Sequence, residues 1–415
     1  METDVFERLL GVEGQALLRE VRDVEPAREL EAATKLRRSH DASLVSAALA
    51  QARFRQRAVA KFGAADAARM YFTPNGLEQA TRAPVAEHRA RRFAELGARR
   101  VLDLCCGAGG DALALARAGI QVLAVDRDPL TCAVARANAE ALGLADRMEV
   151  RCADVTEVAT DGWDAVFADP ARRTGRGRVF DPEAYSPPLS WAVETARRAP
   201  LAALKVAPGI PHEAVPPEAG AEWVSDGGEV KEAVLWFEQG RARTRAQGGS
   251  GGTSGPGGPG GVRATLLPAG RTLTGRGLPD PETGPVGRYL FEPDGAVIRA
   301  HLVAEVAAQV AGRLIDPTIA YVTADAPHRT PYAAGYEITD VLPFNVKKLR
   351  ALLRERGVGV VTVKKRGSAV EPEELRRKLK LDAKAHRGAC TVFLTRVAGA
   401  PSMLLGHPLG GSEAP

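Results

Sequence analysis

The sequence predicts an α/β protein in which a seven-stranded, mainly parallel sheet follows a helical N-terminal region and precedes a small α/β module. Three observations predict this organisation. Residues 1–97 show no strand-like alternation, short β-rich runs alternate with helical stretches from residue 101 onward, and a glycine-rich stretch follows the last of these runs. Strands that alternate with helices at this spacing form parallel sheets with both faces covered. A length of 415 residues suits two or three domains.

The expected elements follow in order along the chain. Before residue 98, apolar residues recur at three- and four-residue spacing, as in LVSAALAQARFRQRAVAKF, which predicts helices. Strands are expected at 101–105, 121–126, 148–154, 163–169 and 201–207, and the runs AEWVS and KEAVLWFE complete the sheet. A hairpin in RATLLPAGRTLTG and a helix over 293–315 should then lead to the last module. The predicted segments are a helical region 1–97, a sheet domain 98–240, a linker or loop 241–262, a connecting hairpin and helix 263–335, and a basic α/β module 336–407.

Composition excludes several classes of protein. Hydrophobic residues make up 45% and charged residues 26%, which excludes fibrous and wholly disordered chains. No apolar run reaches the roughly 18 residues of a membrane span, and METDVFERLL lacks the basic and then apolar pattern of an export signal. Five cysteines without metal-ligand spacing predict no metal site. We therefore expect a cytoplasmic protein with no membrane or metal partner.

Positive charge is concentrated near the C-terminus. The net charge of the chain is +5, but residues 343–396 hold 15 lysines and arginines against 5 acidic residues. Lysine pairs stand at Lys347-Lys348 and Lys364-Lys365, and Arg366 follows the second pair. A local field of this kind suits a polyanion such as RNA, although a solvated surface face is the simpler alternative.

The strongest motif is the stretch VLDLCCGAGGDALALARAG. A strand enters Gly107, Gly109 and Gly110 and continues directly into a helix, so that a ligand can approach the backbone and the helix N-terminus. The spacing also satisfies a dinucleotide fingerprint, with Asp126 placed for a ribose. Asp103 distinguishes between a dinucleotide and S-adenosylmethionine as the ligand of this loop. An acid inside the first strand is unusual in a dehydrogenase and favours S-adenosylmethionine, whose methionyl end is positively charged.

Taken in order, these motifs resemble those of the class I S-adenosylmethionine-dependent methyltransferases, which have a Rossmann-like sheet. The resemblance covers roughly half the chain, and each motif stands at the C-terminal end of a predicted strand, where open α/β sheets bind ligands. It implies that the second-strand acid binds both ribose hydroxyls and that the third-strand acid lies near the adenine amine. The implied cofactor-binding residues are Asp103, Cys105, Gly107, Ala108, Gly109, Asp126, Arg127, Asp154, Val155 and Asp169.

The fourth strand ends in Asp169-Pro170-Ala171-Arg172, at the place of the family's catalytic (D/N)PP(Y/F) motif. In relatives that methylate exocyclic amines of bases, the acid and the first proline hold the amine, and the aromatic residue stacks on the base. Here alanine and arginine replace the second proline and the aromatic, and an arginine plane can also stack on a base. The resemblance implies catalytic roles for Asp169, Pro170, Arg172 and Arg173. The run RRTGRGR either contacts a phosphate backbone or is a surface loop with incidental arginines.

Two cysteines next to each other invite a further hypothesis. Cys105 and Cys106 could supply a thiolate nucleophile, as in cytosine-5 methylation. They lie in the predicted cofactor loop and not in the substrate motif, so we reject this role in favour of buried structural thiols.

Residues 336–407 resemble the THUMP-like domain that follows this type of methyltransferase in bacterial proteins. THUMP domains bind RNA in tRNA-modifying enzymes, so the resemblance implies RNA contacts by Lys347, Lys348, Lys364, Lys365 and Arg366. We expect an RNA methyltransferase, with tRNA ahead of rRNA as substrate. Two alternatives stay open at this point: a methyltransferase of a small molecule or protein, and a non-catalytic protein that binds S-adenosylmethionine and RNA.

Overall fold

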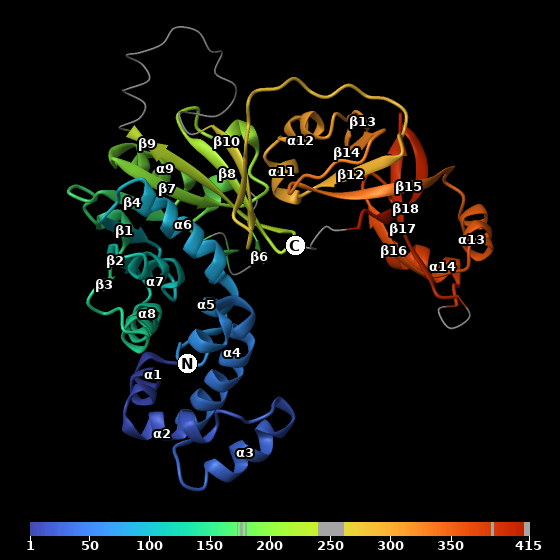
Figure 1. The fold of residues 1–415 in the computed structure, drawn as a ribbon. Coiled ribbons are helices and arrows are strands. Elements are labelled where there is room, and N and C mark those ends of the chain that lie inside the picture. The colour runs from blue at the N-terminus through green and yellow to red at the C-terminus, as the bar shows by residue number, and fades with distance from the viewer. Residues whose placement is uncertain (172, 175–176, 179–180, 240–260, 383–385, 411–415) are drawn as a thin grey trace. The chain divides into compact units, whose positions relative to one another are not determined.

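The computed structural model describes every residue except 172, 175–176, 179–180, 240–260, 383–385 and 411–415. The chain divides into two compact units (Figure 1), Met1–Ala221 with Ala233–Gly260 and Glu222–Glu232 with Gly261–Pro415. The α/β class is confirmed, because both units contain sheets with helices. Nearly all of the linker expected at 241–262 lies outside the described residues.

The N-terminal region is helical, as predicted. The longest helix begins after Asp41, whose Oδ1 accepts hydrogen bonds from the backbone N–H groups of Ser43 (3.0 Å) and Leu44 (3.1 Å). It bends at Gly63, whose φ of 75° interrupts the helical geometry. The helices of this region are α1 (Thr3–Leu10), α2 (Val12–Glu20), α3 (Glu29–Leu36), α4 (Ala42–Ala67), α5 (Pro74–Gln79) and α6 (Ala83–Glu95).

These helices do not form a domain of their own. Phe6, Leu9 and Leu44 are buried in one apolar cluster with Val134 of helix α8 (Pro129–Leu142) and Ala108 of the glycine-rich loop. Residues 1–97 therefore belong to the same compact unit as the parallel strands of the central sheet.

The central sheet contains the predicted strands. Four of its pairings, β1 with β2, β2 with β3, β1 with β4 and β4 with β7, are parallel, and β9 is antiparallel to β7. The strand order is β11-β10-β8-β9-β7-β4-β1-β2-β3. The strands are β1 (Arg100–Leu104), β2 (Gln121–Asp126), β3 (Met148–Cys152), β4 (Ala165–Ala168), β7 (Leu201–Val206), β8 (Gly220–Asp226), β9 (Glu229–Glu238), β10 (Val262–Leu267) and β11 (Arg271–Thr274).

This sheet has nine strands, two more than the seven predicted. The predicted hairpin is present as β10 and β11, but it extends the sheet beside β8. Thr265 in β10 is fully buried and its hydroxyl donates to Glu222 in β8 over 2.7 Å. A hairpin on its own is marginally stable, and a strand edge offers unpaired backbone groups for it to join.

Helices connect the parallel strands. They are α7 (Gly110–Arg117), α8 and α9 (Leu189–Arg198), and a two-stranded ribbon of β5 (Arg173–Thr174) and β6 (Gly177–Arg178) follows β4. Helix α6 packs beside α7 (Figure 1), and the ring of Phe93 in α6 packs against Trp236 of β9 at a 55° tilt, with ring centroids 5.2 Å apart. The core of this unit therefore joins the N-terminal helices to the sheet.

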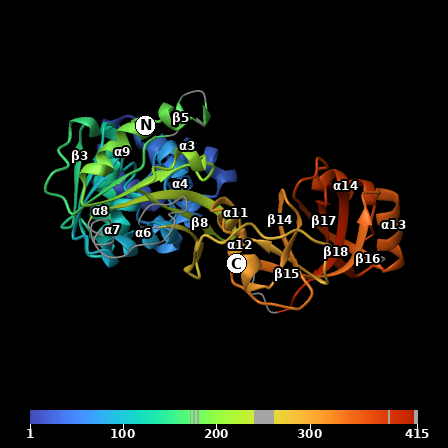
Figure 2. The same ribbon diagram turned by 90° about the horizontal axis from the view of Figure 1, so that it is seen from above.

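The second unit carries a seven-stranded sheet of order β13-β14-β12-β15-β18-β17-β16. Helices α13 and α14 lie together on one face of it (Figure 2), with Leu349, Leu353, Leu375 and Leu379 fully buried. Its elements are β12 (Tyr289–Pro293), α11 (Gly295–Arg299), α12 (Val303–Gln309), β13 (Arg313–Asp316), β14 (Ile319–Ala324), β15 (Ala333–Pro343), α13 (Val346–Glu355), β16 (Val358–Lys365), α14 (Pro372–Leu379), β17 (Gly388–Val397) and β18 (Ala400–Pro408).

The prediction of a single helix over 293–315 is wrong. The chain forms the short helices α11 and α12 and then strand β13. His301 (φ 56°) and Ala311 (φ 47°) adopt left-handed backbone conformations that end each helix. Gly312 follows, where an added Cβ would lie 2.6 Å from Val322 Cγ1 of β14. The apolar spacing of this stretch is helical throughout, but its last residues pair with β14 as a strand.

Candidate active site

Three of the four motif acids lie in, or directly after, strands whose C-terminal ends are hydrogen-bonded to each other. The backbone N–H of Cys106, after β1, donates to Val125 of β2 over 3.0 Å, and the N–H of Asp169, after β4, donates to Leu104 of β1 over 3.2 Å. The ends of β1, β2 and β4 are thereby fixed side by side. Asp103, Asp126 and Asp169 consequently lie together at the C-terminal ends of the parallel strands, where open α/β sheets bind ligands.

The glycine-rich loop turns sharply between β1 and α7. Cys105 (φ 64°), Gly107 (φ 58°) and Gly109 (φ 87°) all have positive φ, and Gly109 immediately precedes the helix. An added Cβ at Gly109 would lie 3.0 Å from Met148 Cε, so only glycine fits there without displacement of its neighbours. The carbonyl of Ala108 accepts a hydrogen bond from Asn138 Nδ2 over 3.0 Å. The loop is therefore held in a single backbone path.

Asp126 terminates β2 beside this loop. Its Oδ2 accepts from the backbone N–H of Gly107 over 3.1 Å, and its Oδ1 accepts from the N–H of Asp128 over 3.0 Å. Each carboxylate oxygen keeps a further lone pair for a ligand. Arg127, the next residue, is exposed.

Asp154 follows β3 and is exposed, whereas Val155 after it is buried. Asp154 Oδ1 accepts from the hydroxyl (2.7 Å) and the backbone N–H (2.9 Å) of Thr156, and these hydrogen bonds lower the pKa of Asp154. In the register of the sheet, Cys152 of β3 lies opposite Asp126. Asp154 therefore follows the strand that neighbours Asp126.

Asp103 is the most unusual of the motif acids. It is fully buried, and neither of its carboxylate oxygens accepts a hydrogen bond from the described residues. Burial, followed by the negative charge of Asp169, raises the pKa of Asp103 to about 8, while the cations of Arg89 and Lys205 act in the opposite direction. A buried acid without a partner is costly, so this carboxyl group calls for a ligand that donates hydrogen bonds or carries positive charge.

The predicted catalytic segment begins at the end of β4. Asp169 is half-buried and its Oδ2 lies 2.6 Å from Nζ of Lys205, a residue of β7. Pro170 is buried, and Ala171 exchanges two backbone hydrogen bonds of 3.0 Å with Ser186. Arg172 lies outside the described residues, and of Arg173 only the backbone, in β5, is described. Asp169 and Pro170 are thus placed beside the glycine-rich loop, and the roles of the two arginines stay predictions.

Sequence reasoning missed several polar residues that surround these motifs. Lys205 is one of them, although a lysine within the apolar strand LAALKVA was a usable signal. Asn138 is another: besides Ala108, its amide binds the backbone N–H (2.6 Å) and carbonyl (3.1 Å) of Tyr71. Gln51 similarly holds both backbone groups of Phe72. The N-terminal region therefore passes directly beside the glycine-rich loop, for which the sequence offered no signal.

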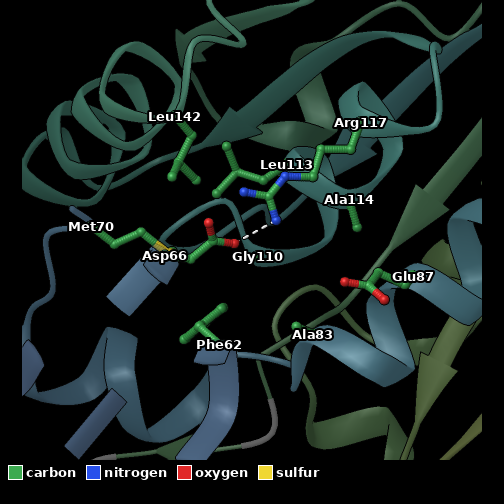
Figure 3. Close-up of a pocket in the computed structure, with 10 residues that line it drawn as sticks. All are labelled: Phe62, Asp66, Met70, Ala83, Glu87, Gly110, Leu113, Ala114, Arg117 and Leu142. Carbon is green, nitrogen blue, oxygen red and sulfur yellow. Dashed lines mark ion pairs between the residues drawn. The ribbon is translucent and has the colours of Figure 1, made fainter. Parts of the chain in front are cut away.

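A small hollow is lined in part by residues of helix α7 (Figure 3). Side chains from α4 and α6 face α7 across it, and Asp66 pairs with Arg117 over 2.5 Å. Its lining residues are Phe62, Asp66, Met70, Ala83, Glu87, Gly110, Leu113, Ala114, Arg117 and Leu142. None of the four motif acids is among them, so this hollow is distinct from the candidate active site.

The predicted RNA-binding cations of the second unit fall into two groups. Lys347 and Lys348 are exposed in the first turn of α13. Lys364 and Arg366 instead share Glu292, at 2.5 and 3.8 Å, and Lys365 pairs with Glu371 at 2.6 Å. Although burial lowers the pKa of Lys364, its hydrogen bond to Glu292 raises it overall. Lys347 and Lys348 are therefore better placed to meet an external anion.

Two further kinds of feature do not occur in the described part of the chain. No helix there is long and apolar enough to cross a membrane. No group of three or more His, Cys, Asp and Glu side chains that could hold a metal ion occurs among the same residues.

Three families match segments of the chain. Residues 98–186 match the RNA cap guanine-N2 methyltransferase family, residues 333–408 match the THUMP domain-like family, and residues 2–58 match a domain family of unknown function. The second match covers the strands and helices from β15 to β18.

Individual relatives extend these matches. A Mycobacterium tuberculosis H37Rv protein described as an uncharacterized S-adenosylmethionine-dependent methyltransferase is 35% identical over 338 residues, which is 80% of this chain and 86% of the relative. A 23S rRNA (uracil(1939)-C(5))-methyltransferase of Acidithiobacillus ferrooxidans is 35% identical over 97 residues, 23% of this chain and 20% of that protein. A Porphyromonas gingivalis W83 structure, assigned as a methyltransferase, has a TM-score of 0.73 at 22% identity and covers 95% of this chain and 98% of its own. This last match shows a shared fold.

Proposed function

Because the chain belongs to the S-adenosylmethionine-dependent methyltransferases, we propose that it methylates a base of RNA, with tRNA ahead of rRNA as substrate. Two comparisons support RNA as the substrate. The domain that carries the glycine-rich loop is similar to a family named for RNA cap guanine-N2 methylation and, over 97 residues, to a 23S rRNA methyltransferase. The THUMP-like match favours tRNA, because THUMP domains occur in tRNA-modifying enzymes.

The residues at the strand ends fit S-adenosylmethionine. Asp103 offers a buried carboxyl group without a partner, which suits the cationic amino group of the methionyl end. Asp126 offers lone pairs on both oxygens for the two ribose hydroxyls, and no atom lies within 4 Å of a Cβ added at Gly107, so that a ligand has room against the loop. We assign the adenine amine to Asp154, which follows the neighbouring strand β3. When bound, S-adenosylmethionine supplies a methyl group on a positively charged sulfur.

The position of Asp169 is the observation that carries the proposal. Its carboxylate follows β4 beside the cofactor loop, and the Lys205 ion pair uses only Oδ2. A carboxylate accepts hydrogen bonds and does not donate them, so the remaining oxygen suits an acceptor that carries an N–H group. In this geometry Asp169 orients a base nitrogen toward the methyl group. Placement of this kind can lower a barrier by on the order of 7 to 11 kcal/mol.

The cysteines disfavour methylation of a ring carbon through a thiolate. Burial, with the charges of nearby acids, raises the pKa of both Cys105 and Cys106 well above that of an ordinary thiol. Both thiols are therefore protonated at neutral pH, and both belong to the cofactor loop. A nitrogen acceptor held by Asp169 is the more consistent chemistry.

The test is transfer of labelled methyl from S-adenosylmethionine to total RNA purified from a strain that lacks the gene. We expect label in a defined RNA, and at least a 100-fold lower initial rate with Asp169→Ala, because well-positioned groups contribute on that order. Asp161→Ala is the matched control, since Asp161 is an exposed acid in the turn that precedes β4.

The outcomes separate the alternatives. Label in proteins or small molecules, but none in RNA, would contradict RNA as the substrate and leave the enzyme class intact. Binding of S-adenosylmethionine without transfer to any fraction would favour a non-catalytic RNA-binding protein. Equal rates for wild type and Asp169→Ala would contradict the role of Asp169.

A further inference from the structure

A charged side chain outside all four motifs enters the candidate active site. Lys205 lies in β7, in a strand whose residues are all buried, and is itself 5% exposed. Its Nζ lies 2.6 Å from Asp169 Oδ2 and donates to Thr81 Oγ1 over 2.9 Å. Lysine is almost never buried unless it is paired, and a paired buried charge is seldom worth more than an apolar residue for stability alone. Stability alone therefore does not explain why a lysine is buried at this position.

The hydrogen bonds continue beyond Lys205 into the N-terminal helices. The Thr81 hydroxyl donates to Asp111 Oδ2 over 2.7 Å, and the other oxygen of Asp111 binds Arg89 of α6. The Arg89 guanidinium in turn lies 4.5 Å from the ring centroid of Phe167, two residues before Asp169 in β4. The network thus starts and ends on the segment that carries Asp169.

We propose that Lys205 is a positioning residue for Asp169, and that Thr81 holds Lys205 in the place this requires. The inference rests on the proposed function, in which Asp169 orients the acceptor. An aspartate side chain rotates about two bonds, and the ammonium group fixes Oδ2, so that Oδ1 alone remains for the substrate. Sites whose first contacts are held by a second layer of hydrogen bonds keep the sub-ångström geometry that methyl transfer needs.

This arrangement assigns a task to part of the N-terminal region. Thr81 and Arg89 belong to residues 1–97, whereas Asp111 and Asp169 belong to the motif-bearing sheet domain. The helical region therefore contributes to the orientation of the acceptor acid through Lys205, in addition to its apolar packing against α8. Lys205, Thr81 and Arg89 do not contact the acceptor in the proposal.

The test compares Lys205→Met, Lys205→Arg and Thr81→Val with wild type, at a temperature well below the unfolding midpoint of every variant. Thr81→Val keeps the shape of the side chain and removes only the hydroxyl. Lys231→Met is the control, because Lys231 is another ion-paired lysine, 2.5 Å from Glu229, outside this network. Crystal structures report the side-chain rotamer of Asp169, and kinetics report kcat and KM for RNA together with the affinity for S-adenosylhomocysteine.

We expect Asp169 to leave its wild-type rotamer in Lys205→Met, and kcat at saturating S-adenosylmethionine to fall about 100-fold with KM for RNA within twofold of wild type. Thr81→Val should lower kcat less, and Lys205→Arg should retain more activity than Lys205→Met. An unchanged Asp169 rotamer in Lys205→Met, or an unchanged kcat in a folded variant, would overturn the proposal. If wild type transfers nothing to RNA, the proposed function fails, and the rotamer of Asp169 still decides the role of Lys205.

Discussion

Asp103 carries a conflict between stability and binding. The folded protein buries this carboxyl group without a hydrogen-bond partner, and burial together with Asp169 raises its pKa from 3.8 to about 8. The folded state therefore holds a proton that the unfolded state releases above pH 4. The resulting contribution to the free energy of unfolding is complete below pH 4 and is lost as the pH rises toward 8, by up to about 1.4 kcal/mol per pH unit.

Asp103→Asn tests both sides of this conflict. The amide of the variant cannot ionise. The unfolding free energy of wild type, measured by urea denaturation, should therefore fall relative to that of the variant as the pH rises from 4 to 8. Its affinity for S-adenosylhomocysteine by calorimetry should drop at least tenfold, because a charged partner of the amino group is lost. Wild-type affinity should rise with pH up to about 8, since binding a cation requires the ionised acid. Parallel stability curves for the two proteins would contradict the raised pKa.

At the scale of elements, the turn from β1 into α7 determines the shape of the cofactor loop. Gly109→Ala should lower the free energy of unfolding by about 1 to 2 kcal/mol, because φ is 87° there. The new Cβ also meets Met148 Cε at 3.0 Å, so we expect a loss of cofactor affinity as well. Gly143→Ala is the matched control: φ is 74° and no atom lies within 4 Å of the added Cβ. Both should lose stability in chemical denaturation, and only Gly109→Ala should bind S-adenosylhomocysteine more weakly.

The same elements show what a sequence can reveal about a site of this kind. Asp103, Gly109 and Asp126 could be predicted because each motif is local and ends a strand, and parallel strands bring their C-terminal ends to one edge. The contacts of Lys205 could not, because its partners Asp169 and Thr81 are 36 and 124 residues away in the sequence. The addition of β10 and β11 to the sheet was equally hidden, since periodicity identifies a hairpin but not the strand edge that it joins.

At the scale of the whole molecule, the chemistry and the positive charge belong to different units. The motif acids and Lys205 lie in the first unit, and the cationic segment 343–396 lies in the second. If the second unit binds RNA by its phosphates, affinity should depend steeply on salt, whereas the choice of base remains with the first unit. RNA affinity and the choice of base should then be separable by mutation.

Charge reversal of Lys347 and Lys348 provides this separation. Both side chains are exposed in the first turn of α13, so Lys347→Glu with Lys348→Glu should weaken binding to unfractionated tRNA. The slope of log affinity against log salt should become shallower by about 2 if each lysine meets one phosphate. Lys364→Gln is the contrasting variant: it leaves Glu292 with a weaker partner, so it should lower the stability of the second unit and keep the slope. Cofactor affinity should be unchanged in both proteins. A slope that falls with Lys364→Gln, and not with the α13 pair, would place the RNA surface on β16.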